Sequence, residues 1–177
     1  MARTTFQGPV RSLGGFYSQG PNTVVNAANG TNTMTLDVAT YAGRILRTND
    51  ATLIITLPAI VASADPVSSG PGADPNTLNN IGATYRIFIE TTASAVAIKT
   101  DGTDKFVGSV ISVDTDSSGA VVGFTAGATN DYINFNGTTT GGVAGTWVQI
   151  FALAANKYMV NGIALGSGTV ATPFADA

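Results

Sequence analysis

Histidine and cysteine are both absent from the 177 residues of this sequence. Histidine is the side chain most often used for proton transfer near neutral pH and for metal binding. The absence of cysteine excludes disulfides, thiolate metal ligands and cysteine nucleophiles. Carboxylates, Lys, Tyr, Ser and Thr are the reactive side chains that remain. We therefore expect no enzymatic activity, no cofactor and no catalytic residues.

Charge is also scarce. Charged residues make up 11% of the chain, against about 25% in an ordinary soluble domain. The net charge of −3 does not indicate the basic surface that nucleic-acid binding requires. No apolar run approaches the roughly 18 residues of a membrane-spanning helix, and residues 1–6 lack the apolar region of a signal peptide. We therefore expect neither nucleic acid nor a membrane as a partner.

The residues that are abundant favour strands. Thr, Val, Ile and aromatic residues suit a pleated sheet, whereas good helix formers are few and Glu90 is the single glutamate. Short apolar runs recur between Gly, Asn, Asp and Pro, at spacings of roughly 8–12 residues. They predict about ten short strands: 24–25, 34–38, 44–48, 52–57, 83–92, 95–100, 106–113, 120–125, 132–136, 146–153 and 158–163. The fold class is therefore all-β, an antiparallel β-sandwich or a jelly-roll-like domain.

The clearest of these strands is Ala83–Thr92. Apolar residues occur at both alternating sets of positions, with Tyr85 and Ile87 in one set and Phe88 in the other. A strand that is apolar on both faces is typical of a position between two layers. We therefore expect both faces of this strand to be covered.

The distribution of Gly and Pro predicts three parts of the chain. Residues 1–22 form an extended N-terminal arm, residues 23–163 form the β-sandwich domain, and residues 164–177 form a C-terminal tail. Within the domain, residues 59–80 are rich in Pro, Gly, Ser and Asp and read as a long surface loop. The arm carries spaced apolar residues that we interpret as contacts to a neighbouring subunit rather than as a frayed terminus: Phe6, Val10, Leu13, Phe16 and Tyr17.

One segment resembles half of a calcium-binding loop. Asp114 and Asp116 are followed by Ser117, Ser118 and Gly119, as in the first half of a D-x-D-x-[DNS]-G loop. Thr125 stands where a bidentate Glu is required. A hairpin turn explains these residues equally well. We therefore expect no metal site, with weak calcium binding at Asp114 and Asp116 left open.

Three further features suggest a functional site, and each also has an ordinary structural explanation. Asp101 and Asp104 could serve glycoside hydrolysis only if they faced each other across a cleft about 5–9 Å wide, and we expect two acids in one short turn to face water. The Gly-rich residues 138–142 lack the Lys and the helix of a P-loop. Trp147 reads as a core or interface anchor in preference to a sugar-binding platform.

Several blocks of the sequence, in their order, resemble structural proteins of tailed bacteriophages. The blocks are Gly8–Phe16, Gly43–Asp50, Thr56–Ala59, Gly82–Ile89, Tyr132–Gly142, Gly145–Val148 and Asn156–Val160. The later ones are similar to capsid decoration (cement) or head-fibre proteins. The resemblance implies a virion protein on the outer surface of the capsid that binds the major capsid protein, often as a homotrimer. It implies no catalytic residues.

Three functions compete at this point. The first is a decoration protein that stabilises the capsid, with the arm residues as contacts to the capsid or to another subunit. The second is a tail-fibre, tail-spike or adhesin domain that binds a host glycan. The third is a glycosidase or a calcium-dependent carbohydrate module. Self-association is expected separately, because open sandwiches leave edge strands that few charges protect here, and a homotrimer fits.

Overall fold

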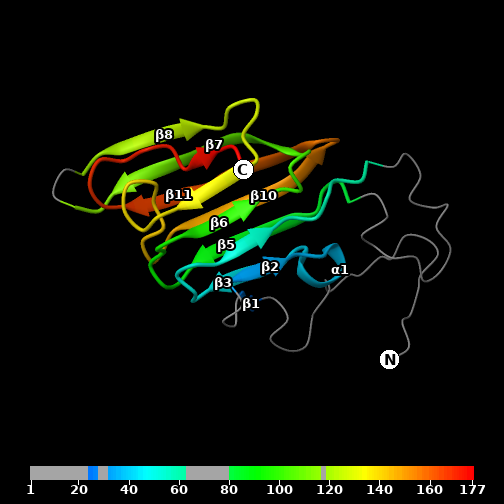
Figure 1. Ribbon diagram of the computed structural model, residues 1–177, viewed down its shortest axis with the longest axis horizontal. Helices are drawn as coiled ribbons and strands as arrows, with labels where there is room; N and C mark the ends of the chain where they lie inside the picture. Colours follow the sequence, from blue (N-terminus) through cyan, green and yellow to red (C-terminus); the bar gives the residue numbers. More distant parts are fainter. Residues whose placement is uncertain (1–23, 28–31, 63–79, 117–118) are drawn as a thin grey trace, which may run out of the picture.

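The structure, a computed structural model, describes residues 24–27, 32–62, 80–116 and 119–177, which form two open, mixed β-sheets (Figure 1). The all-β prediction is confirmed. The seven-stranded sheet has the order β1 (Val24–Ala27), β3 (Ile45–Thr48), β5 (Thr84–Ile89), β10 (Trp147–Ala154), β11 (Lys157–Gly166), β7 (Lys105–Asp114), β8 (Val121–Thr125). The five-stranded sheet has the order β12 (Phe174–Ala175), β9 (Tyr132–Phe135), β6 (Val96–Lys99), β4 (Ile54–Thr56), β2 (Thr33–Thr35). These twelve strands exceed the predicted number of about ten.

The prediction of an antiparallel arrangement is wrong for about half of the strand pairs. From β1 to β6 the chain passes from one sheet to the other at every strand, so that strands two apart in the sequence become neighbours. The pairs β1/β3, β3/β5, β2/β4 and β4/β6 are therefore parallel, as is β7/β11. A parallel pair needs a crossover, and for the first four pairs the intervening strand in the opposite sheet supplies it. The jelly-roll alternative is not confirmed.

One predicted strand ends early and gives way to a helix. The prediction placed Met34–Val38 in a strand, but β2 ends at Thr35 and a four-residue helix, α1, spans Val38–Tyr41. Asp37 caps this helix, because its carboxylate accepts a hydrogen bond of 2.7 Å from the backbone N–H of Thr40. Among the described residues, no helix is long and apolar enough to cross a membrane.

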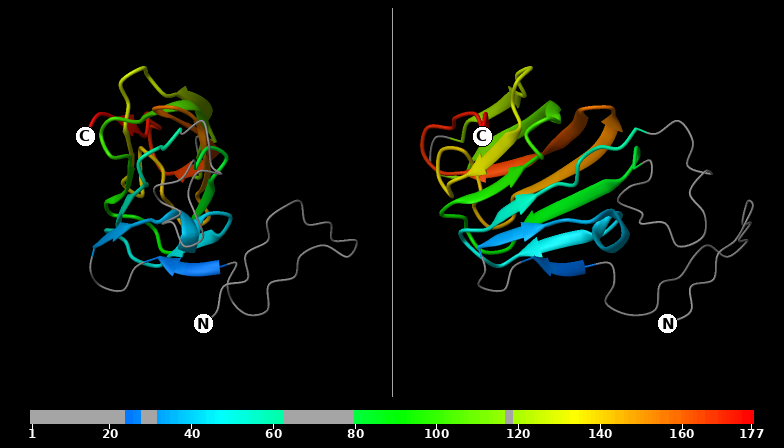
Figure 2. Two further views of the ribbon diagram at one scale, coloured as in Figure 1. Left: turned by 90° about the vertical axis from the view of Figure 1, so that its right-hand side faces the viewer. Right: turned by 45° about the vertical axis from the view of Figure 1, so that its right-hand side comes forward.

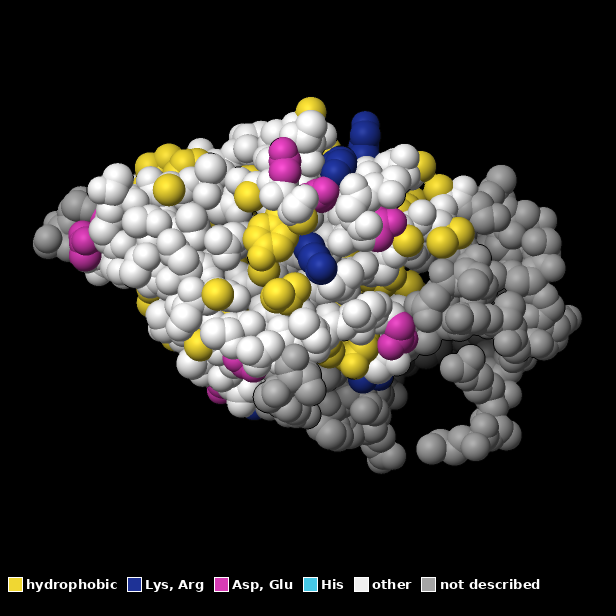
Figure 3. Space-filling view, in the orientation of Figure 1, with side chains coloured by type: hydrophobic (Ala, Val, Ile, Leu, Met, Phe, Trp, Pro, Cys, Tyr) yellow, Lys and Arg dark blue, Asp and Glu magenta, His cyan; other side chains and the backbone are white. Residues whose placement is uncertain are grey.

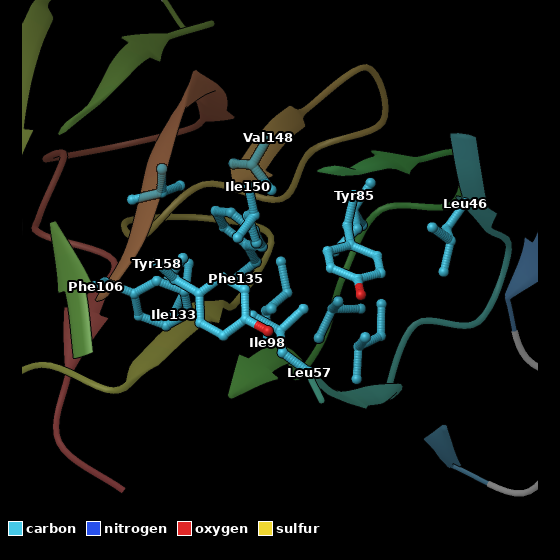
Figure 4. Packing of buried hydrophobic residues seen from close by; sticks show 14 of the residues in the cluster. Leu46, Leu57, Tyr85, Ile98, Phe106, Ile133, Phe135, Val148, Ile150 and Tyr158 are labelled. Atoms are coloured by element: carbon cyan, nitrogen blue, oxygen red, sulfur yellow. The ribbon is translucent and has the colours of Figure 1, made fainter. Parts of the chain in front are cut away.

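A single core lies between the two sheets, which Figure 2 shows as two layers. Alternate residues of each strand point inward, as the pleat requires. The seven-stranded sheet contributes Tyr85, Phe106 and Tyr158, and the five-stranded sheet contributes Ile98 and Phe135 (Figure 4). The rings of Phe106 and Tyr158 pack at an interplanar angle of 47°, with centroids 6.5 Å apart. Each fully buried side chain of this size contributes roughly 1.5–3 kcal/mol.

The ends of the long predicted loop are tied together by one buried residue, Asn80. Its side chain accepts a hydrogen bond from the N–H of Val61 at 2.9 Å and donates one to the carbonyl of Ala59 at 2.8 Å. Its own N–H donates to the carbonyl of Val61 at 3.0 Å. The two described ends of this segment, at Val61 and Asn80, therefore lie side by side. Residues 63–79 of this loop, and the whole predicted arm 1–22, lie outside the described residues.

The segment predicted as a C-terminal tail contributes to both sheets. β11 continues to Gly166, and Phe174–Ala175 forms β12 against β9. Phe174 is buried in the core. Because residues 164–177 are small and mostly uncharged, their sequence gives little sign of these pairings.

Candidate functional site

A row of side chains crosses six strands of the seven-stranded sheet on the face that points away from the core. The registers place these residues side by side, one from each of β3, β5, β10, β11, β7 and β8. We call the row Arg47, Phe88, Trp147, Ile163, Ile111 and Gly123 the outer row, and the sheet surface around it the outer face. At about 4.8 Å between strands the row is roughly 24 Å long.

The alternation along each strand exposes this row. On β10, Trp147 is 39% exposed while the next residue, Val148, is 1% exposed and faces the core. Phe88 on β5 and Ile111 on β7 are likewise exposed, at 37% and 47%. A solvent-exposed row with several large apolar side chains is unusual on a sheet of a monomeric protein. The prediction that both faces of the 83–92 strand are covered is therefore wrong among the described residues, because only its inner face packs on a second layer.

Gly162 brings β11 close to β10 beneath the outer row. A Cβ atom at Gly162 would lie 2.3 Å from the carbonyl oxygen of Trp147 and 2.8 Å from the Cα of Val148. Real Cβ atoms do not approach so closely, so any larger residue would force the strands apart. The glycine therefore helps to set the spacing between Trp147 and its register partner Ile163.

Two shallow hollows flank the outer row. One, of about 200 Å³, is lined by Ile45, Arg86, Phe88 and Trp147 among others, and the second, of about 270 Å³, is lined by Phe151, Leu153 and Met159 among others. Both fall below the range of roughly 300–1,000 Å³ that is usual for small-molecule pockets. The outer face therefore suits a broad partner rather than a small ligand.

Charge on the outer face is limited and partly neutralised. The Arg47 Nε atom lies 3.0 Å from a Glu90 carboxylate oxygen, with both side chains nearly half exposed. Such a surface pair contributes at most about 1 kcal/mol to stability, but it cancels two charges beside Phe88. Arg86 lies in the adjacent row. Figure 3, which views the molecule from the side of the five-stranded sheet, shows that charged side chains are also sparse on that side.

Asp101 and Asp104, the two candidate acids for glycoside hydrolysis, have different surroundings. The Asp101 carboxylate accepts hydrogen bonds of 2.9 Å from the N–H groups of Thr103 and Asp104, which stabilises the turn. Asp104 is buried at 2% exposure and accepts a bond of 2.8 Å from the N–H of Ile60. Burial raises the pKa of Asp104, against the lowering effect of the Ile60 N–H. The expectation that both acids face water is wrong for Asp104.

Two buried tyrosines lie further inside. The Tyr158 hydroxyl donates a hydrogen bond of 2.6 Å to the carbonyl of Pro58. The Tyr85 hydroxyl has no hydrogen-bond partner among the described residues. Burial raises the pKa of Tyr85 to about 12, with a further contribution from Asp37, and burial also raises the pKa of Tyr158. Both phenols stay protonated at neutral pH and serve packing.

The calcium-like segment forms part of a network that holds a turn. The Asp114 carboxylate, only 5% exposed as a residue, accepts a bond of 3.0 Å from the N–H of Asp116, whose own carboxylate accepts one of 2.9 Å from the N–H of Gly168. Thr125, at the position of the missing Glu, lies at the far end of β8 opposite Ser109. In the part of the chain that the structure describes, no group of three acidic side chains could hold a metal ion.

A partly buried ion pair joins β7 to the segment before β9. The Lys105 Nζ lies 2.6 Å from a carboxylate oxygen of Asp131, which is 6% exposed. The other Asp131 oxygen accepts a hydrogen bond of 2.8 Å from the backbone N–H of Ala177. The hydrogen bond from Lys105 lowers the pKa of Asp131, the effect of burial opposes it, and the Ala177 N–H adds to the lowering. The pair is structural, because it fixes three segments of the fold.

The predicted contact residues can now be placed. Phe6, Val10, Leu13, Phe16 and Tyr17 all lie outside the described residues. Trp147 is exposed on the outer face and is not a core residue. Sequence patterns did not identify the other apolar members of the outer row, although the apolar residues on both faces of the 83–92 strand were a signal for Phe88.

Comparisons of the chain with protein-family models, with curated proteins and with solved structures found no match to any of them.

Proposed function

We propose that this chain is a virion structural protein that decorates and stabilises a phage capsid, and that its outer face binds the shell of the major capsid protein. The single observation that carries the proposal is the outer row, which crosses six strands and includes the exposed apolar side chains of Phe88, Trp147 and Ile111. The ordered sequence blocks that resemble decoration proteins support the choice of scaffold. The proposed location is the outer surface of the capsid.

The chemistry of the outer face favours a protein partner. A row roughly 24 Å long is comparable with the width of a standard protein interface. Arg47 is paired with Glu90, so the face offers no basic track for nucleic acid phosphates. Exposed aromatic and large aliphatic side chains such as Trp147 and Phe88 are the residues that dominate binding energy when a partner covers them. The preferred surface on the capsid is therefore neutral and apolar.

Co-sedimentation with assembled capsids tests the proposal. Trp147→Ala should weaken capsid binding by roughly tenfold or more, as expected for a central aromatic contact. Tyr132→Ala is the matched control, because Tyr132 lies in β9 on the outward side of the opposite sheet, next to the buried Ile133. Equal binding by the two variants and the unchanged chain would contradict the use of the outer face.

A tail-fibre or adhesin domain that binds a host glycan is the second candidate. Trp147 and Phe88 lie in register on the outer face, with Gln149 and Arg86 in the next row. Aromatic rings beside hydrogen-bonding side chains also suit a sugar ring. A glycan array with clear hits that Trp147→Ala abolishes would favour this candidate. Hundreds of copies per virion would favour decoration, and tens would favour a tail component.

A further inference from the structure

The edge strand β8 has hydrogen-bonding groups that point out of the sheet. β8 pairs with β7 on one side and is the last strand of the seven-stranded sheet among the described residues. At its two ends, the N–H of Asp114 donates to Ala120 and the N–H of Ala126 donates to Gly108. In an antiparallel ladder such bonded pairs alternate. The backbone groups of Val122 and Phe124 therefore face β7, and those of Val121, Gly123 and Thr125 face outward.

This edge lacks the features that usually prevent strand pairing. Natural edge strands are commonly short, bulged, charged or interrupted by proline. β8 has five residues, while the edge strands β2 and β12 of the other sheet have three and two. Residues 117–130 contain no charged residue and no proline. Val121 is 65% exposed and Val122 is 37% exposed, so apolar surface lies beside the outward backbone groups.

We propose that β8 pairs with β8 of a second copy of this chain, antiparallel and centred on Gly123. A strand edge is satisfied by another strand, and an uncharged edge can meet its own copy without repulsion. The register centred on Gly123 places Val121 opposite Thr125 of the partner subunit, and Gly123 opposite Gly123 of the partner subunit. Each facing pair then exchanges two backbone hydrogen bonds. A shift by two residues in either direction would leave outward groups of both strands unpaired.

The side chains suit this register. Val121 and Thr125 are both β-branched and lie on the outer side of the sheet, a favourable cross-strand pair. At the centre, Gly123 carries no side chain, and a Cβ built on it meets nothing within 4 Å, so the strand is open there. On the other side of the sheet, the half-exposed Val122 meets Phe124 of the partner subunit. The pairing thus covers the exposed valines of both copies.

The symmetry of this pairing has a consequence for function. Facing residues of an antiparallel pair lie on the same side of the sheet. The two outer faces would therefore point the same way, on one continuous sheet that joins both copies. If the proposed docking to a capsid is right, two faces bind one scaffold and gain avidity. The pairing itself does not depend on that docking, and it makes a two-fold dimer rather than the homotrimer that the sequence resemblance implies.

Sedimentation equilibrium of the full chain at micromolar concentration tests the pairing. The unchanged chain should have twice its mass of 17.9 kDa. Gly123→Pro removes an outward N–H and keeps the ladder to β7, the position at which an edge strand tolerates proline. It should weaken dimerisation by roughly thirtyfold, because two central bonds are lost per dimer. Val121→Lys should also weaken it, through added charge at the edge.

Leu153→Lys is the matched control for added charge, since Leu153 is 49% exposed at the end of β10. It should leave the dimer intact. Amide exchange gives an independent measurement: the N–H groups of Val121, Gly123 and Thr125 should be protected in the dimer. In Gly123→Pro those of Val121 and Thr125 should lose protection, while those of Val122 and Phe124 stay protected. A monomer, or a trimer that none of these substitutions affects, would overturn the pairing. Capsid binding is scored separately, so failure of one proposal does not imply failure of the other.

Discussion

Trp147 on β10 and Phe88 on β5 lie directly opposite each other in the antiparallel register, and both side chains point away from the core. They are 39% and 37% exposed. Two large aromatic residues side by side on an uncovered sheet surface contribute little to the folded monomer relative to what they could contribute under a partner.

Because Trp147 is exposed, alanine substitutions along β10 should differ in how much they lower the free energy of unfolding. Trp147→Ala should lower the free energy of unfolding by less than about 1.5 kcal/mol, because the ring remains partly in water. Ile150→Ala, on the inner side of β10 and fully buried, should lower it by roughly 2–5 kcal/mol. Urea denaturation of the two variants measures the difference. A larger loss for Trp147→Ala would mean that another part of the chain covers the outer face.

Alanine substitutions at Gly137 and Gly82 distinguish the energetic cost of backbone strain from that of a steric clash. Both have positive φ, +74° and +88°, but a Cβ at Gly137 would lie 2.0 Å from the carbonyl oxygen of Ala93, whereas a Cβ at Gly82 meets nothing within 4 Å. Gly82→Ala should cost roughly 1–2 kcal/mol from the left-handed conformation alone. Gly137→Ala should cost roughly 3 kcal/mol or more. Thermal unfolding checks the order, and equal losses would contradict it.

The two buried tyrosines predict opposite responses to the loss of a hydroxyl. Tyr158→Phe removes the bond to the carbonyl of Pro58 and should destabilise the protein by roughly 1–2 kcal/mol. Tyr85→Phe removes a buried hydroxyl that has no partner among the described residues, so it should be neutral or stabilising. Each variant is the control for the other, since ring packing is kept in both. A clear loss for Tyr85→Phe would indicate an ordered water on that hydroxyl.

Asp131 predicts an acid-sensitive contribution to stability. Its pKa is lowered in the folded state by the hydrogen bond from Lys105, so the contribution is present above the unfolded pKa of 3.8 and is lost as pH falls through the folded pKa. Asp131→Asn leaves Lys105 without its charge partner and should cost roughly 1–3 kcal/mol at pH 7. Denaturation curves at several pH values should show this cost shrinking in acid. A cost that is independent of pH would contradict the role of the charge.

The carboxylate of Asp104 should affect the pH dependence of stability in the direction opposite to that of Asp131. Burial raises its pKa above 3.8, so the carboxylate destabilises the folded state above the folded pKa, and this penalty disappears below the unfolded pKa. Asp104→Asn keeps an acceptor for the N–H of Ile60 and removes the buried charge. Its free energy of unfolding should therefore exceed that of the unchanged chain at pH 7, with the gain lost in acid. A loss of stability at pH 7 would contradict this explanation.

The arm prediction concerns residues outside the described structure and can be tested directly. Deletion of residues 1–20 should abolish capsid binding and leave the circular dichroism spectrum and melting temperature of the β-domain nearly unchanged. A full-length variant with Ser at Phe6, Val10, Leu13, Phe16 and Tyr17 is the control for chain length and should also fail to bind. Normal binding by the truncated protein would remove the arm from the proposed interface.

Local patterns in the sequence were enough to locate most strands. The strand around residues 83–92 alternates clearly, and the structure places β5 there. The predicted 34–38 strand is wrong only in its second part, because β2 ends at Thr35 and Asp37 caps the short helix that follows. Strand direction could not be predicted, because alternation is the same whether a neighbour is parallel or antiparallel.

The candidate site was likewise only partly predictable from the sequence. Trp147 could be identified as a residue with a special role, but the sequence could not say that it shares a row with Phe88 and Ile111. Those three residues come from strands far apart in the chain, and only the sheet registers bring them together. Asp104 likewise looked like a turn residue facing water, and its burial depends on the neighbouring Ile60 segment.

The sequence by itself determined the all-β class, the scarcity of charge and the absence of histidine and cysteine chemistry, because composition and short-range alternation act locally. The tertiary structure alone decided the mixed sheets, the outer row and the open edge at β8. These depend on which strands become neighbours, and that choice is made by the passage of the chain between the two sheets around one core.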